Sequence, residues 1–305
     1  MPLTGPLYVR SASAPPVPRA LPLVIALTGF TDAGSAVSQL VDYFQDELDP
    51  TPLAVFANDV LLDYRARRPV ISFEQDHLTD YRPPRLELAL AHDALGQPFL
   101  LLSGYEPDFA WDAFTAAVLE FVEIFAISTV TWVHAIPMPV PHTRPIGTTV
   151  SGTRSELTEA HSVWQPHTQV PSTAGHLLEY RLAESGASVS GFVLLVPHYL
   201  GDTEYPAAAL AGLDSLTVAT GLVFTGDDLR EENREYLAKV DEQVAGSDEL
   251  SRMVQGLEER YDAYMAGSTL ATPMIHTGDL PSADELAAEL ERFLATRPTG
   301  DDDKR

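Results

Sequence analysis

An apolar run passes into a glycine turn at Leu23-Val24-Ile25-Ala26-Leu27-Thr28-Gly29-Phe30-Thr31-Asp32-Ala33-Gly34. A second stretch repeats the same order of residue types, Phe99-Leu100-Leu101-Leu102-Ser103-Gly104-Tyr105-Glu106-Pro107-Asp108. Each has an apolar segment, then a hydroxyl residue, a glycine, an aromatic residue and an acidic turn. This order is typical of a buried parallel strand that passes into a helix at the carboxyl edge of an α/β sheet.

The two glycine turns indicate where a site would lie, because open α/β sheets bind ligands at the carboxyl edge of their strands. The candidate ligand-binding or interface residues in the turns are Thr28, Gly29, Asp32, Gly34, Gly104, Glu106 and Asp108. Neither turn has the glycine spacing of a phosphate-binding loop, and carboxylates repel a bound anion. The alternative is that Asp32 and Asp108 cap the following helices, each cap contributing ~1 kcal/mol.

The remaining sequence predicts an alternation of strands and helices. Further strands are expected at residues 53–56, 70–73, 86–90, 99–102, 128–134 and 189–196. The alternating pattern of residues 86–90 indicates a more exposed strand, and His134 is expected at the end of its strand. Helices are expected over 33–48 and 114–125, from Ser172 to Gly186 and from Pro206. Residues 57–84 and 135–171 are expected to be mostly irregular.

The predicted organisation has four parts along the chain. They are a flexible Pro-rich lead (1–20), a three-layer α/β/α domain with a mostly parallel or mixed sheet (21–225), a helical hairpin (226–266) and a tail with a short helix at 283–295 (267–305). The two charged, amphipathic helices of the hairpin are expected to meet at Gly246-Ser247.

Composition excludes several classes of partner. The net charge of −25 argues against nucleic acid, which requires clustered cations. The cluster of Arg65, Arg67 and Arg68 is interpreted as solvated surface, because acidic residues flank it. No apolar run approaches the roughly 20 residues of a membrane span. The chain has no cysteine and shows no signal peptide, so we expect a cytoplasmic protein.

The Pro-rich segment around residues 137–145 contains the best catalytic residue types. His142 could transfer protons near neutral pH, and Arg144 could bind a carboxylate or phosphate. His198, after the last strong strand, is a further candidate. The alternative is a rigid loop whose His142 and Arg144 pair with nearby acids. No histidine spacing matches a metal site, and no serine lies in a nucleophile elbow, so no cofactor is expected.

Five motifs occur in a fixed order, and together they resemble the PAC2 (proteasome assembly chaperone 2) family in its actinobacterial form. They are Gly29-Phe30-Thr31-Asp32-Ala33-Gly34, Gly104-Tyr105-Glu106-Pro107-Asp108 with Trp111, Pro141-His142-Thr143-Arg144-Pro145, Val170-Pro171-Ser172-Thr173-Ala174-Gly175 and Val196-Pro197-His198-Tyr199-Leu200. The resemblance covers about residues 20–265.

The resemblance implies a phosphorylase/hydrolase-like α/β/α fold with a helical extension, and a homo-oligomer, namely a homotrimer. It further implies a non-catalytic assembly factor whose partners include proteasome subunits. Some relatives dock through a carboxy-terminal hydrophobic-Tyr-any ending, whereas this sequence ends Asp303-Lys304-Arg305. The first alternative is a nucleoside-phosphorylase-like or hydrolase-like enzyme that acts on a small molecule at the glycine turns. The second is a purely structural oligomer.

Overall fold

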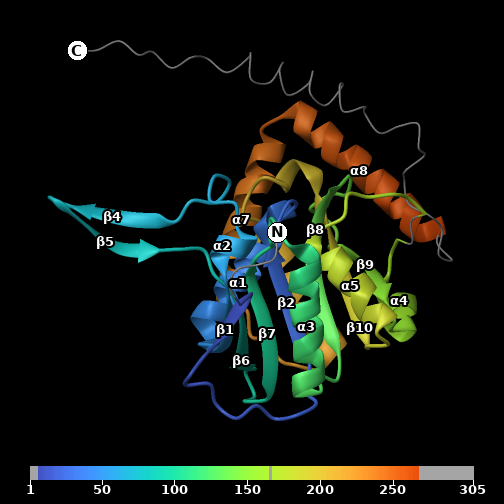
Figure 1. The fold of residues 1–305 in the computed structure, drawn as a ribbon. Coiled ribbons are helices and arrows are strands. Elements are labelled where there is room, and N and C mark those ends of the chain that lie inside the picture. The colour runs from blue at the N-terminus through green and yellow to red at the C-terminus, as the bar shows by residue number, and fades with distance from the viewer. Residues whose placement is uncertain (1–5, 165–166, 268–305) are drawn as a thin grey trace.

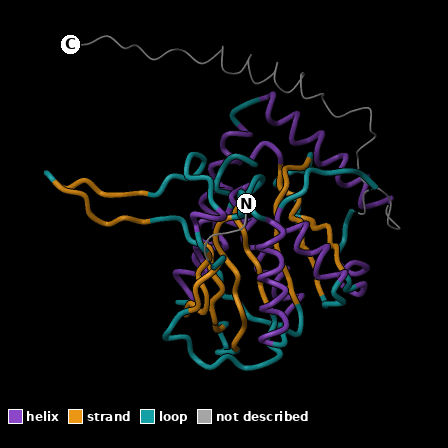
Figure 2. The backbone as a smooth tube through the Cα atoms, in the orientation of Figure 1, coloured by secondary structure: helices purple, strands orange, loops and turns teal. Residues whose placement is uncertain are grey.

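The structure, a computed structural model, describes residues 6–164 and 167–267. An eight-stranded mixed sheet lies between two layers of helices (Figures 1 and 2), which confirms the predicted α/β/α architecture. None of the helices in these two ranges is long and apolar enough to cross a membrane.

The central sheet has the strand order β1-β3-β6-β7-β2-β8-β10-β9. Its parallel centre comprises β7 (Pro98–Tyr105), β2 (Leu23–Thr28), β8 (Val130–Met138) and β10 (Val189–Pro197). Antiparallel pairing adds β6 (Leu86–His92), β3 (Thr51–Phe56) and β1 (Tyr8–Arg10) on one side and β9 (Gly147–Gly152) on the other. The two repeated sequence stretches therefore form parallel strands, as predicted, and these strands are neighbours in the sheet.

Helices cover both faces of this sheet. One core contains Val24 and Ala26 of β2 and packs under α1 and α6, whereas the other contains Leu23 and Ile25 and packs under α3 and α5. Successive strand residues point to opposite faces, so β2 supplies both cores. The helices of the body are α1 (Ala36–Leu48), α2 (Asn58–Leu61), α3 (Trp111–Phe125), α4 (Ser155–His161), α5 (Ala174–Glu184) and α6 (Pro206–Thr220), with 3₁₀ turns η1 (Ala33–Ser35) and η2 (His198–Leu200).

The predicted helical hairpin is present. It consists of α7 (Asp227–Ala245) and α8 (Asp248–Gly267), which meet at Gly246-Ser247. Leu229 and Val240 of α7 belong to the core beneath α1 and α6, which ties the hairpin to the body. The predicted helix at 283–295 lies outside the described residues.

A two-stranded arm projects from the body on the side of α2 (Figure 1). It is built from β4 (Val70–Glu74), which was predicted, and β5 (His77–Arg82), which was not. Its large apolar side chains are exposed, including Phe73 at 71% and Leu78 at 61%. A lone two-stranded hairpin is only marginally stable in water, so the arm is suited to contact with another surface.

Three expectations from the sequence are wrong. Strand β6 is buried rather than exposed, because β3 and β7 flank it and its one acidic residue, Glu87, forms an ion pair with Arg85. Residues 135–171 are not one long loop, since they contain the end of β8 and all of β9 and α4. His134 consequently lies inside β8 instead of at its end. In addition, β1 extends the sheet from within the predicted flexible lead.

Candidate functional site

The two glycine turns lie side by side at the carboxyl edge of the sheet. In the parallel pairing of β2 with β7, Thr28 is opposite Tyr105. The Thr28 hydroxyl donates to the Gly104 carbonyl at 3.3 Å, and the Glu106 amide donates to the Thr28 carbonyl at 2.7 Å. The two turns, each expected at the carboxyl edge, therefore meet there.

Asp32 caps α1, as the capping alternative predicted. Its carboxylate accepts hydrogen bonds from the amides of Val37 at 2.7 Å and Ser38 at 2.9 Å. The first amides of a helix have no partner within the helix and carry a partial positive charge. Asp32 satisfies two of them, so this helix end has no free anion site. Gly34, with φ +69°, links the turn to Gly201 by a backbone hydrogen bond of 2.7 Å.

Glu106 performs the equivalent role at the second turn, but its partners come from other parts of the chain. Its buried carboxylate accepts from the amide of Ala174, the first residue of α5, at 2.6 Å and from the amide of Phe30 at 3.0 Å. A Cβ atom on Gly29 would lie 2.1 Å from Glu106 Oε2, so a larger residue there would have to displace the Glu106 carboxylate. The chain therefore places its own carboxylate where the α5 amides would bind an anion.

The expectation that Asp108 caps a helix is wrong. Its carboxylate accepts from the Asp63 amide at 2.7 Å and forms an ion pair of 2.5 Å with Arg67. Arg67 also donates to the Glu106 carbonyl at 2.9 Å and lies over the Tyr105 ring at 5.6 Å. Arg67 consequently holds the second turn in place through these contacts and is not part of a solvated basic face. Sequence gave no sign of this, because these partners are distant along the chain.

A small cavity lies behind Glu106. Trp132, His134, Thr173 and Gly175 line it with Glu106, and its volume is about 10 Å³. A cavity of this size holds roughly one water molecule, whereas small-molecule sites occupy about 300–1,000 Å³. This cavity is therefore too small for a substrate in this structure.

His134, which lines this cavity, and the neighbouring His176 are held in the neutral form. Burial, with a smaller contribution from His176, lowers the pKa of His134 to about 4. Burial also lowers the pKa of His176, whose Nδ1 accepts from the Thr173 amide at 3.1 Å and completes a capping box at the start of α5. The ring of Trp132 contacts both imidazoles, with centroids 5.9 and 5.2 Å away. Both histidines therefore pack against Trp132 in an aromatic cluster.

His142 and Arg144 do not reach the glycine turns. His142 Nε2 lies 3.1 Å from Asp241 of α7 and Nδ1 lies 2.6 Å from the Tyr199 hydroxyl. Arg144 makes ion pairs of 2.6 Å with Asp262 and 3.2 Å with Glu258 of α8, and these carboxylates raise its pKa. The alternative of pairing with nearby acids is therefore the observed one, and both residues fasten the hairpin to the body.

His198 follows β10 and does not line the cavity behind Glu106. It begins η2, and its ring contacts Tyr199 with centroids 5.4 Å apart. Of the predicted candidates, the structure brings together Thr28, Gly29, Gly104 and Glu106, with Asp32 and Asp108 on either side. The residues that sequence reasoning missed are Arg67, His176 and the Ala174 amide. Within residues 6–164 and 167–267, no cluster of acidic or histidine side chains could hold a metal ion.

Three large apolar side chains are exposed near the carboxyl edge. Phe30, in the first turn, is 79% exposed, and Phe109, which follows the second turn, is 51% exposed. Val170, which precedes α5, is also exposed. The Phe30 amide donates to Glu106, and the Phe109 amide donates to the Leu61 carbonyl, so the backbone at both phenylalanines is held in place. The edge thus presents two ordered phenylalanine side chains on its outer surface.

Comparison with known proteins gives concordant similarities. Residues 26–244 match the PAC2 family. A Mycobacterium tuberculosis protein of unknown function is 41% identical, with a TM-score of 0.79 over 85% of this chain and 90% of that chain. A Corynebacterium glutamicum protein of unknown function is 35% identical, with a TM-score of 0.81 over 85% and 98%. A proteasome-assembly chaperone homologue from Mycobacterium tuberculosis is 21% identical, with a TM-score of 0.69 over 77% and 100%. Comparison with curated proteins gives no significant match.

Proposed function

Because this chain belongs to the PAC2 family, we propose that it is a cytoplasmic, non-catalytic assembly factor of the proteasome-assembly-chaperone type. Its partners are proteasome subunits and further copies of itself. A structural neighbour from Mycobacterium tuberculosis bears the name proteasome-assembly chaperone homologue, which supports this class of partner.

The observation that carries the proposal is the carboxyl edge, which has only a small cavity inside and two ordered phenylalanine side chains outside. Asp32 and Glu106 occupy the amide groups that would bind an anionic substrate, and the cavity behind Glu106 holds about 10 Å³. Exposed apolar groups that are held in place favour contact with a protein. Phe30, at 79% exposure, is the most prominent of them.

Affinity capture from a host that contains proteasomes tests the proposal. We expect cross-linking of the wild-type chain to recover proteasome subunits, and we expect Phe30→Ser to lose them while keeping its circular dichroism spectrum. Leu95→Ser is the matched control, since Leu95 is 70% exposed in the turn between β6 and β7, away from this edge. Recovery of no proteasome subunit by the wild type would overturn the proposal.

The exposed arm formed by β4 and β5 supports self-association, and the number of copies, three, comes from the family resemblance alone. Its five exposed apolar side chains are Val70, Ile71, Phe73, Leu78 and Tyr81. We propose that the arm packs on a second copy of this chain. Light scattering should give three times the 33.2-kDa chain mass, and Phe73→Asp with Leu78→Asp should reduce this to the monomer. A monomeric wild type, or a trimeric double variant, contradicts the arm's role.

One observation favours an enzyme as the second candidate. Glu106, His134 and His176 are titratable groups close together at the sheet edge, where α/β proteins bind ligands. A nucleoside-phosphorylase-like or hydrolase-like activity would require the edge to open. Thermal shift with nucleosides, inorganic phosphate and small carboxylic acids separates the candidates, because a bound ligand at 100 times its Kd adds about 2.7 kcal/mol of stability. We expect no shift.

A further inference from the structure

A second cavity lies on the face of the sheet that packs under α3, beneath the segment that follows β1. We propose that this cavity binds an anionic amphiphile, with an acidic head group on Arg10 or Arg19 and an alkyl or aryl tail on the apolar floor. The cavity measures about 450 Å³, which lies within the range of about 300–1,000 Å³ for small-molecule sites. It is separate from the edge cavity behind Glu106.

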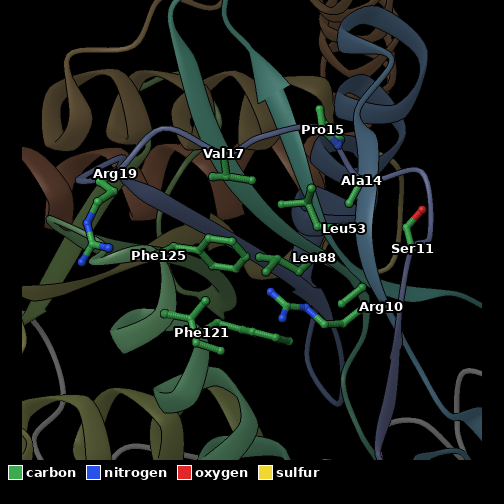
Figure 3. A pocket seen from close by; sticks show the side chains of 12 residues that line it. Arg10, Ser11, Ala14, Pro15, Val17, Arg19, Leu53, Leu88, Phe121 and Phe125 are labelled. Atoms are coloured by element: carbon green, nitrogen blue, oxygen red, sulfur yellow. The ribbon is translucent and has the colours of Figure 1, made fainter.

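The cavity has a defined wall and floor (Figure 3). Leu53 and Leu88 from the sheet and Phe121 and Phe125 from α3 form the apolar floor, and Val17 covers it from the overlying segment. These groups can receive an apolar tail, and aromatic rings supply a large part of the contact area in such sites.

The overlying segment is anchored at both of its ends. The Ser11 amide donates to the Leu53 carbonyl at 2.9 Å, and the Ala20 amide donates to the Phe125 carbonyl at 3.3 Å. Between these anchors the chain crosses the cavity as a strap. The cavity is therefore bounded by backbone hydrogen bonds to the sheet and to α3.

The charge of the cavity points to an anionic ligand. Its lining includes Arg10 and Arg19 and no acidic residue. Neither arginine forms a salt bridge among the described residues, in contrast with Arg67 and Arg144. Two acids of α3, Glu120 and Glu123, are adjacent in sequence to lining residues but are not in the lining, and Glu120 accepts from the Tyr8 hydroxyl at 3.2 Å. The chain has a net charge of −25, so two arginines without a carboxylate partner at one apolar cavity favour an anionic ligand there.

The two arginines lie on opposite sides of the cavity, so either one can hold an acidic head group while the apolar floor between them holds the tail. Figure 3 shows Arg10 extending along the floor toward Leu88 and Phe121, and Arg19 at the opposite side next to Phe125. A guanidinium group binds carboxylate and phosphate oxygens through two parallel hydrogen bonds. The shared ligand chemistry is thus an acidic head group joined to an apolar tail of medium length.

Isothermal titration calorimetry with the full chain tests this site. The probes are dodecanoate and dodecyl phosphate, below their micelle-forming concentrations, with uncharged dodecanol as the matched control. We expect at least one anion to bind at one site per chain, and the stronger anion identifies the head group. Arg10→Ala with Arg19→Ala should weaken binding at least about tenfold, because a hydrogen bond to a charged group contributes roughly 1.5–3 kcal/mol.

Two further variants make the result decisive. Val17→Trp should fill the cavity and weaken binding while both arginines remain, and Arg68→Ala, which removes an arginine outside the cavity, should leave binding unchanged. The proposal is overturned if neither anion binds, if dodecanol binds as tightly as the anions, or if the double arginine variant binds as the wild type does. It is also overturned if Arg68→Ala weakens binding as much as the double variant does.

Discussion

Replacing Glu106 with glutamine should destabilise the protein, because the carboxylate closes the sheet edge. The side chain is 6% exposed, and its two oxygens accept separately from the amides of Phe30 and Ala174. Glutamine offers one acceptor oxygen and one NH₂ donor, so one buried amide loses its acceptor. A buried donor without a partner costs about 1–3 kcal/mol, and losing the negative charge at the start of α5 costs roughly 0.3–1 kcal/mol.

Together these contributions predict a loss of about 1.3–4 kcal/mol in the free energy of unfolding. With roughly 2 °C per kcal/mol for a chain this long, the melting temperature should fall by about 3–8 °C. Urea unfolding and calorimetry measure both quantities. Glu235→Gln is the control, because Glu235 is exposed on α7. A carboxylate kept for catalysis or ligand binding behaves in the opposite way, since its removal commonly stabilises a protein. An unchanged or raised melting temperature for Glu106→Gln would therefore refute the structural role.

Three further predictions concern other parts of the molecule. Gly104→Ala should lower the free energy of unfolding by about 2–5 kcal/mol. Gly104 has a φ of +131°, and the new Cβ would lie 1.9 Å from the Arg85 carbonyl oxygen. Urea unfolding measures the loss, and a value below about 1 kcal/mol contradicts this packing. The pKa of His134 is about 4 in the folded chain and 6.5 in the unfolded chain. The unfolded chain therefore binds more protons between these two pH values, and the free energy of unfolding falls by up to about 3 kcal/mol as the pH falls from 6.5 to 4. His134→Leu should flatten this part of the pH dependence of urea unfolding, and a variant with the wild-type slope contradicts the shift. Arg144→Ala should speed amide hydrogen exchange in α8, which loses its ion pairs to Arg144, and should leave exchange in α3 unchanged. Equal protection of α8 in the wild type and the variant contradicts the role of Arg144 in holding the hairpin on the body.

The sequence predicted the parts of the fold that depend on neighbouring residues. The repeated order at Thr28–Asp32 and Ser103–Asp108 identified two buried strands and the edge that they share, and Gly246-Ser247 identified the junction of the hairpin. Asp32 was correctly interpreted as a cap, because its partners Val37 and Ser38 lie within the next turn. These features follow from periodicity and capping, which act over a few residues.

The features that the sequence did not predict depend on distant partners. Glu106 closes the edge through Phe30 and Ala174, 76 and 68 residues away. Arg144 meets Asp262 at a separation of 118 residues, so its role as a fastener of the hairpin required the fold. Strand β6 was judged exposed because Glu87 breaks its apolar pattern, but an ion pair with Arg85 allows that carboxylate to be buried.

The most direct test of the central claim is reconstitution of proteasome assembly from purified subunits. The yield and rate of assembled particles should rise when the wild-type chain is added, and Phe30→Ser should remove this gain while Leu95→Ser retains it. The same preparation should give no thermal shift with nucleosides or phosphate. An assembly rate that is unchanged by the wild-type chain would contradict the account, most clearly if a nucleoside or phosphate then raised its melting temperature.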